Sequence, residues 1–230
     1  MNDTKRKLAA IVFTDIAGFT KLSSNNEPAA LALLEKQREL LQPVVEKNNG
    51  EWLKEIGDGL LLAFGTTRDA VDCAIEIQHL TKEIESLDLR IGIHQGEVVF
   101  KGNDVVGDDV NIASRIEPFA ATGGIAISGR VNSSLDRDPE FDTEYLGTPD
   151  LKGVNQEVKV YCIVSHNLPK TDASKVQAKI EKKGFQWNLL SISGAALTLI
   201  GLLFWINLSF IGIGIADTNE VLSVAVLPFE

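Results

Sequence analysis

The chain has 230 residues, of which 44% are apolar and 23% are charged, a composition typical of one globular domain with a further segment. The net charge of −10 argues against a protein that binds the nucleic-acid phosphate backbone, and we expect no nucleic-acid partner. Cys73 and Cys162 are far apart in sequence, which favours two buried thiols over a zinc motif or a disulfide framework.

The first predicted element is a β-rich strand over residues 8–13, which leads directly into Asp15. Gly18 and Thr20 follow, and a helix is expected to begin a few residues further on. An acid at a strand end, followed by a tight turn with free backbone N–H groups, suits a metal-bridged phosphate. A helix-capping role explains Asp15 equally well, so the residue alone does not decide between the two.

Two amphipathic helices are predicted next, over residues 27–47 and within residues 66–84. The first periodicity places Leu31, Leu34, Leu41 and Val45 along one face. The second helix is expected to have a threonine N-cap. Its predicted inward residues are Ala70, Ala74, Ile77 and either Leu80 or Ile84.

Between these helices, residues 51–64 contain two apolar arms around a Gly-Asp-Gly turn and predict a β-hairpin. A type I′ turn accounts for Asp58 by itself, because Asp-Gly is the usual signal for such a turn. If the hairpin neighbours the first strand, however, Asp58 and Asp15 meet at one edge of the sheet. Two carboxylates there would bind two divalent cations, as in phosphoryl-transfer enzymes.

Alternating apolar residues from Leu87 to Ile93 predict a further strand, in which His94 is out of step and is interpreted as structural. A short helix then ends before Pro118. Within it, Asn111 and Arg115 are four residues apart and share a face. That pair could orient a ribose and clamp a phosphate, although a solvated helix edge has the same spacing.

Two charged residues stand at matching places in two loops, since Lys54 lies three residues before Gly57 and Asp104 three before Gly107. A lysine supplies donors and an aspartate an acceptor, so together they could read the edge of adenine, whose N1 accepts and whose N6 donates. Asp108 and Asp109 are interpreted as helix N-terminal acids with a structural role.

Two more strands are predicted in the segments "GGIAISG" and "VKVYCIVS". Strands and helices are therefore mixed, with hairpins in place of strict βαβ alternation. This pattern predicts an α+β sandwich, in which helices pack on one mainly antiparallel sheet.

The C-terminal part differs, because residues 189–215 carry no charge and are long enough to cross a bilayer. Trp187 stands at the entrance, and lysines precede the span, so the positive-inside rule places the N-terminal region in the cytoplasm. We expect a single-pass membrane protein with a catalytic domain over 1–168, a basic linker over 169–186, a transmembrane helix over 187–215 and a truncated extracytoplasmic segment over 216–230. A buried core helix is the alternative to the membrane span.

In order, the motifs "FTDIAGFT", "KEIGDG", "GIHQGEVV", "DVVGDDVNIASR" and "LKG…VKVYCIV" resemble the class III nucleotide cyclase catalytic domain. The resemblance covers roughly residues 7–165 and implies the ferredoxin-like fold of cyclases. It also implies an adenylate cyclase that makes cyclic AMP and pyrophosphate from ATP with two divalent metal ions, Mg²⁺ or Mn²⁺.

The resemblance also implies a role for each matched residue. Asp15 and Asp58 match the metal-binding aspartates, and the Ile16 carbonyl matches the additional metal ligand. Lys54 and Asp104 match the pair that selects adenine, where guanylate-specific members carry an acid and a small residue. The other matches are Asn111 for the ribose, Arg115 for the transition state, Lys152 for the triphosphate, and the turn of Gly18, Phe19 and Thr20 for phosphate oxygens.

Members of this family work as head-to-tail dimers, and the resemblance implies a homodimer with two shared sites. One chain would supply Asp15 and Asp58, and the other would supply the remaining five side chains. The connection "KGN" is shorter than the arm of many members, which reduces the expected dimer affinity. A catalytically silent dimerisation module is the alternative from another functional class, and a guanylate cyclase is the second.

Overall fold

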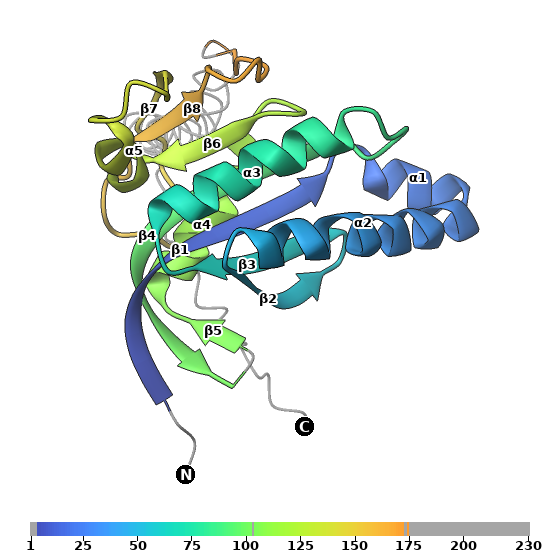
Figure 1. The fold of residues 1–230 in the computed structure, drawn as a ribbon, viewed down its shortest axis with the longest axis horizontal. Helices are drawn as coiled ribbons and strands as arrows, with labels where there is room; N and C mark the ends of the chain where they lie inside the picture. The colour runs from blue at the N-terminus through green and yellow to red at the C-terminus, as the bar shows by residue number, and fades with distance from the viewer. Residues whose placement is uncertain (1–3, 103, 173, 175–230) are drawn as a thin grey trace, which may run out of the picture. The chain divides into compact units, whose positions relative to one another are not determined.

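The structure is a computed structural model, which describes residues 4–102, 104–172 and 174 (Figure 1). Within them, eight strands form one sheet in the order β2-β3-β1-β4-β6-β8-β7, with β5 paired to β4. Neighbouring strands are antiparallel except for β4 and β6, which are parallel. The strands are β1 (Thr4–Ile16), β2 (Gly50–Ile56), β3 (Gly59–Phe64), β4 (Leu89–Lys101), β5 (Asp104–Val106), β6 (Ile125–Ser128), β7 (Thr143–Gly147) and β8 (Val160–Ile163).

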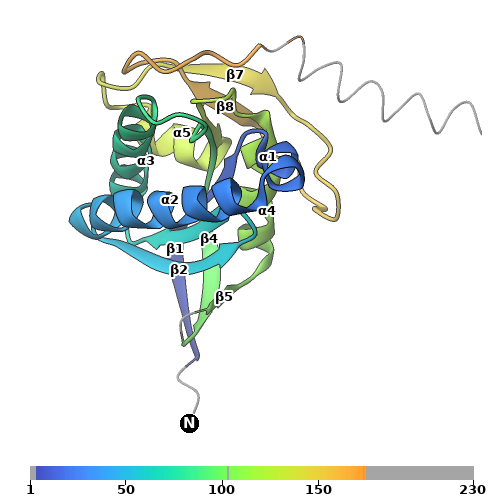
Figure 2. The same cartoon turned by 90° about the vertical axis from the view of Figure 1, so that its right-hand side faces the viewer.

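Helices pack on both faces of this sheet (Figures 1 and 2). On one face, α2 and α3 share a core with alternate residues of β1, such as Ala10 and Val12. On the other face α4 packs over the intervening residues, such as Ala9 and Ile11. The helices are α1 (Phe19–Asn25), α2 (Glu27–Lys47), α3 (Thr67–Thr81), α4 (Asp108–Ile116) and α5 (Gly129–Leu135), with a 3₁₀ turn, η1, over Glu117–Phe119. The predicted mainly antiparallel α+β sandwich is confirmed.

The predicted helices are present, and the buried face of α2 was predicted in part. Leu41 and Val45 are buried as predicted and Leu34 packs partly buried against the core, whereas Leu31 is 57% exposed. The buried face also contains Gln37, a polar residue that a hydrophobic pattern does not identify. For α3 the prediction is correct, because the Thr66 side chain caps its N-terminus by accepting from Asp69 N–H.

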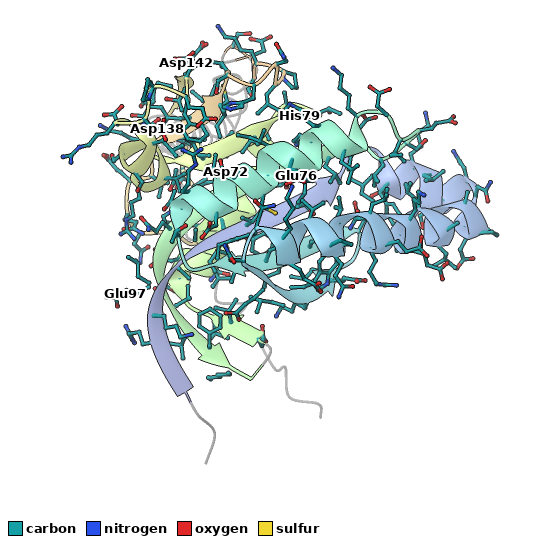
Figure 3. All side chains as sticks on the ribbon, viewed as in Figure 1. Asp72, Glu76, His79, Glu97, Asp138 and Asp142 are labelled. Carbon is teal, nitrogen blue, oxygen red and sulfur yellow. The ribbon has the colours of Figure 1, made fainter. Side chains whose placement is uncertain are left out.

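One charged cluster joins α3 to the segment before β7. Arg68 donates to Asp72 on its own helix, with Nε 2.7 Å from Oδ2, and to Glu140, with Nη2 2.7 Å from Oε2. Its guanidinium also contacts the Asp138 carboxylate and lies 4.6 Å from the centre of the Phe141 ring. Figure 3 labels Asp72 on α3 and Asp138 in the facing segment.

The segment that leaves the last strand remains attached to the domain through residue 171. Leu168 and Thr171 are buried, and the Thr171 hydroxyl accepts a hydrogen bond from Ala121 N–H at 2.9 Å. In the part of the chain that the structure describes, no helix has the length and apolar character needed to cross a membrane. The predicted span over 187–215 lies outside the described residues.

Candidate active site

The two predicted metal-binding aspartates lie at one edge of the sheet, because β3 pairs with β1. Asp15 is the penultimate residue of β1, and Asp58 is in the turn between β2 and β3. The Asp58 carboxylate accepts a hydrogen bond from Ile16 N–H at 3.0 Å. The hairpin therefore neighbours the first strand, which is the arrangement that the sequence required for Asp15 and Asp58 to meet.

Two glycines allow the hairpin turn to sit against β1. Gly57 has a φ of 65°, a left-handed conformation that disfavours other residues. A Cβ on Gly59 would lie 2.3 Å from the carbonyl oxygen of Thr14, so only glycine fits at that place. The turn is also held by Leu60 N–H, which donates to the Thr14 hydroxyl at 3.1 Å. The Gly-Asp-Gly sequence thus serves both the turn and its contact with β1.

Burial raises the pKa of the Asp58 carboxyl, and the negative charge of nearby Asp15 adds to this, against the hydrogen bond from Ile16. Two carboxylates close together favour a cation between or beside them. In the structure Arg90 supplies positive charge, because its guanidinium contacts Asp15. Arg90 Nε also lies 2.9 Å from Glu117 Oε1, which ties this edge to η1.

Arg90 was not among the predicted site residues. It is paired with Asp15 in the β1–β4 register, so the two side chains share a face of the sheet. The sequence shows a charged residue near the start of this strand, but the register that brings it to Asp15 is visible only in the structure. Its position gives the site a permanent positive charge beside the first aspartate.

The donors present fit a hard divalent cation. Two carboxylates and the Ile16 carbonyl are oxygen ligands, which Mg²⁺ and Mn²⁺ prefer. Among the described residues, no three His, Cys, Asp or Glu side chains form a complete metal cage. A partial set of this kind suits an ion that takes its remaining ligands from water and substrate phosphates, as Mg²⁺ usually does.

The predicted phosphate turn follows the metal edge directly. Gly18 has a φ of 83° and stands at the N-cap of α1, which begins with Phe19 and Thr20. Asp15 is therefore not the helix cap. The first N–H groups of a helix have no partner within it, so this turn presents backbone donors next to the two aspartates.

Lys54 and Asp104 are brought together across β2 and β5, with Lys54 Nζ 2.6 Å from Asp104 Oδ1. A register shift in β2 between Trp52 and Lys54 places Lys54 opposite Leu61, on the face of the sheet where α4 packs. The hydrogen bond from Lys54 lowers the pKa of the Asp104 carboxyl. Both side chains remain about half exposed, so a base could reach them.

The remaining predicted residues lie on α4 and on the loop before β8. Asn111 is exposed. Its backbone carbonyl oxygen accepts a hydrogen bond from Arg115 Nη1 at 2.8 Å, which directs the guanidinium back along the helix. Arg115 Nη2 lies 3.8 Å from the position that a Cβ would occupy on Gly153. Lys152 precedes that glycine and is exposed, so the helix and the loop present their cations to one region.

His94 and Asp109 have the structural role predicted for them. His94 is 2% exposed, and its Nε2 lies 3.0 Å from Asp109 Oδ1. The other Asp109 oxygen accepts from Glu97 N–H at 2.8 Å. Asp109 thereby attaches the first turn of α4 to β4.

Comparisons with known proteins agree with this fold and arrangement. The family model described as the adenylate and guanylate cyclase catalytic domain matches residues 2–165. A Rhizobium meliloti (strain 1021) protein provisionally named adenylate cyclase 3 is 32% identical over 165 residues, covering 68% of this chain. The chain spans 28% of the length of that relative.

Two solved structures are similar over the whole cyclase region. An adenylate/guanylate cyclase/hydrolase from Silicibacter pomeroyi is 32% identical with a TM-score of 0.65, covering 73% of this chain and 100% of the other. An adenylyl cyclase from P. aeruginosa is 26% identical with a TM-score of 0.64, covering 71% and 96%. The chain belongs to the family of adenylate and guanylate cyclase catalytic domains.

Proposed function

We propose that the chain is an adenylate cyclase that converts ATP to 3′,5′-cyclic AMP and pyrophosphate. The observation that carries the choice of ATP is the contact between Lys54 and Asp104 at 2.6 Å. This pair offers a donor and an acceptor side by side, which complements N1 and N6 of adenine. In the family that the sequence resembles, guanylate-specific members have an acid and a small residue at these two positions.

The proposed chemistry is positioning and charge stabilisation. Asp15, Asp58 and the Ile16 carbonyl would hold two divalent cations, Mg²⁺ or Mn²⁺. Bound there, these cations lower the pKa of the ribose 3′-hydroxyl and neutralise charge on the triphosphate. The Asn111 amide orients the ribose so that the 3′-oxygen is in line with the α-phosphorus.

The cations of the chain itself act on the phosphates. Arg115 stabilises negative charge on the α-phosphoryl group as the new bond forms, and Lys152 and the amides of residues 18–20 hold the departing pyrophosphate. Arg90 lies close enough to Asp15 to take part in phosphate binding once cations occupy the aspartates. No side chain is required as a general base.

The proposed active form is a homodimer in which each site takes Asp15 and Asp58 from one chain and Lys54, Asp104, Asn111, Arg115 and Lys152 from the other. Exposed apolar side chains support a contact surface on the same elements. Leu8 on β1 is 61% exposed, Ile56 on β2 is 49% exposed and Val106 on β5 is 38% exposed. Apolar groups of this size are commonly covered by a partner.

The first test is a measurement of pyrophosphate and cyclic nucleotide from purified protein given ATP or GTP with Mn²⁺. We expect cyclic AMP from the wild type, little cyclic GMP, and no product from Asp58→Ala. Exposed Asp88, near the same edge but outside the predicted ligand set, is the matched control, and Asp88→Ala should stay active. If ATP binds and no cyclic product forms at any protein concentration, the silent dimerisation module becomes the better interpretation.

A mixing experiment tests the shared sites. Asp58→Ala and Arg115→Ala are each expected to be inactive alone. In a mixture, half of the dimers pair one variant with the other and keep one intact site, so activity should return to about a quarter of the wild-type value. No recovery, with dimers present, would contradict sites built from two chains.

The proposal extends to the membrane on sequence grounds. Residues 187–215 are expected to anchor the protein in a bilayer in a single pass, with the cyclase domain in the cytoplasm. The anchor would raise the local concentration of cyclase domains and favour the dimer. Fractionation of cells that express the chain, with alkaline washing of membranes, checks this; recovery in the wash would contradict it.

A further inference from the structure

A buried polar residue on α2 contacts the turn that carries Asp58. Gln37 is 2% exposed and lies on the helix face that otherwise packs apolar residues into the core. Its Nε2 donates to the backbone carbonyl of Asp58 at 3.3 Å. Its Oε1 has no hydrogen-bond partner among the described residues. A core position is therefore occupied by an amide that is only half satisfied, which costs free energy that an apolar residue would not.

The hydrogen bond from Gln37 reaches the main chain of Asp58, a residue whose side chain is already held by a second hydrogen bond. The Asp58 side chain accepts from Ile16 N–H, while its main-chain carbonyl accepts from Gln37. One contact fixes where the carboxylate lies, and the other fixes the peptide that carries it. With both in place, the turn has little freedom to move Asp58 away from Asp15.

The next residue of α2 contacts the last residues of β2, just before the same turn. Arg38 forms a bidentate pair with Glu55, with Nε and Nη2 each 2.7 Å from a carboxylate oxygen. Glu55 follows Lys54, and side chains alternate along a strand. Glu55 pairs with Leu60 on the α2 face, whereas Lys54 pairs with Leu61 on the opposite face and meets Asp104.

We propose that Gln37 and Arg38 are positioning residues that set two neighbouring parts of this hairpin separately, the turn at Asp58 and the end of β2 that carries Lys54 and Glu55. Gln37 fixes the metal ligand Asp58, and Arg38, through Glu55, fixes the adenine-reading Lys54. This inference rests on the proposed function, which gives those two residues their roles. In a dimer of the proposed kind, Lys54 and Asp58 of one chain belong to different sites, so α2 connects the metal half of one site to the base half of the other.

The test uses the full chain with Gln37→Met, which keeps the volume and removes the donor. Its readout is Mn²⁺ binding, followed by electron paramagnetic resonance in the presence of 3′-deoxy-ATP, which has no 3′-hydroxyl and does not react. Loss of one hydrogen bond should weaken Mn²⁺ binding roughly two- to tenfold. Thermal stability should be equal to or above that of the wild type, and the preference for 3′-deoxy-ATP over 3′-deoxy-GTP should be unchanged.

Arg38→Met is the complementary variant. It should lower the preference for the adenine analogue by roughly two- to fivefold, since the contact it loses is partly exposed, and leave Mn²⁺ binding unchanged. Lys36→Met, on an exposed position of the same helix, is the control and should alter neither quantity.

The separation of the two effects is the deciding result. If both variants weaken metal and base binding together, or lose them in step with thermal stability, the residues have only a structural role and the proposal is wrong. It is also wrong if Gln37→Met binds Mn²⁺ like the wild type. Absence of cyclic AMP from a wild type that still binds Mn²⁺ and 3′-deoxy-ATP would contradict the proposed function alone, whereas a wild type that binds no Mn²⁺ would contradict both.

Discussion

Lys54 Nζ lies 2.6 Å from Asp104 Oδ1, so a side chain of β2 and a side chain of β5 pair with each other within one chain. In the proposed function, an adenine base would replace this contact with two hydrogen bonds of its own. Because both side chains are about half exposed, water screens the pair and the exchange has a modest cost. A base that offers only one of the two hydrogen bonds leaves a charged group without its partner.

Exchange of this pair should change the base that is used. In Lys54→Glu with Asp104→Ser, we expect kcat/KM for ATP to fall by at least about a hundredfold and GTP to become the better substrate, because matched polar contacts discriminate strongly. Cyclic AMP and cyclic GMP formation over a range of each nucleotide measures the change. Lys101→Glu, exposed and paired with Asp104 in the strand register, controls for added negative charge. A double variant that still prefers ATP would contradict adenine reading by this pair.

Gly92 allows α4 and η1 to approach β4. A Cβ there would lie 2.4 Å from Glu117 N and 2.9 Å from the Ala113 carbonyl oxygen, both of which are backbone atoms. Gly92→Ala should therefore reduce the free energy of unfolding by about 2 kcal/mol, the usual cost of overpacking. It should also reduce cyclase activity, because Asn111 and Arg115 lie on the displaced helix.

The matched control for Gly92 is Gly65, which has no atom within 4 Å of its Cβ position. Urea unfolding of Gly65→Ala should differ from the wild type by less than about 0.5 kcal/mol. If the two variants were equally stable, α4 and η1 would be able to move away from β4 without a loss of stability, and the overpacking expected at Gly92 would be contradicted.

The Arg68 cluster should stabilise the attachment of α3 to the segment before β7. Arg68→Ala removes contacts with Asp72, Asp138 and Glu140 and the stacking on Phe141, and we expect the free energy of unfolding to fall by about 1–2 kcal/mol. The loss should shrink in 1 M salt, because the cluster is partly exposed. Arg137→Ala, an exposed neighbour, should have little effect in the same urea titration. A loss that does not depend on salt would assign the effect to packing.

His94 should make the fold sensitive to acid. Burial lowers the pKa of its imidazole despite the hydrogen bond to Asp109, and the charge of Arg130 acts in the same direction as burial. In the unfolded chain the imidazole takes a proton below a pH of about 6.5, whereas in the folded chain it does so only at lower pH. Between those two values the unfolded state binds more protons. The free energy of unfolding therefore falls as the pH is lowered, by up to about 1.4 kcal/mol per pH unit from this group.

The comparison that isolates this effect is the slope of stability between pH 7.5 and pH 5. We expect a shallower decline in His94→Asn than in the wild type. Parallel slopes for the two proteins would contradict a contribution from the buried imidazole.

The sequence predicts those parts of the fold that depend on local periodicity. The strand around Ile91, the helix capped by Thr66 and the hairpin at Asp58 are all where the pattern placed them. The buried face of α2 was predicted only in part, because Gln37 occupies a core position and a hydrophobic pattern cannot identify an amide whose partner is a carbonyl on another element. The short elements α5 and β7 were not predicted, because each depends on packing against its neighbours.

Long-range pairing explains what the sequence left open in the site. The meeting of Asp15 and Asp58 depends on the strand order, and Arg90 reaches Asp15 only through the register of β1 with β4. The register shift before Lys54 likewise decides which face of β2 meets Asp104. No local pattern contains these relationships, since each joins residues far apart in the chain.

The pairing of β1 with β4 has a consequence for biosynthesis. Ile16 pairs with Leu89 and Thr4 with Lys101, so β1 has its longest partner among residues made much later. At about 5–20 residues per second, the ribosome leaves the apolar run of β1 without that partner for several seconds. A nascent chain in that interval exposes a strand edge able to join other chains, and its yield should depend on chaperones that shield the first strand until β4 has emerged.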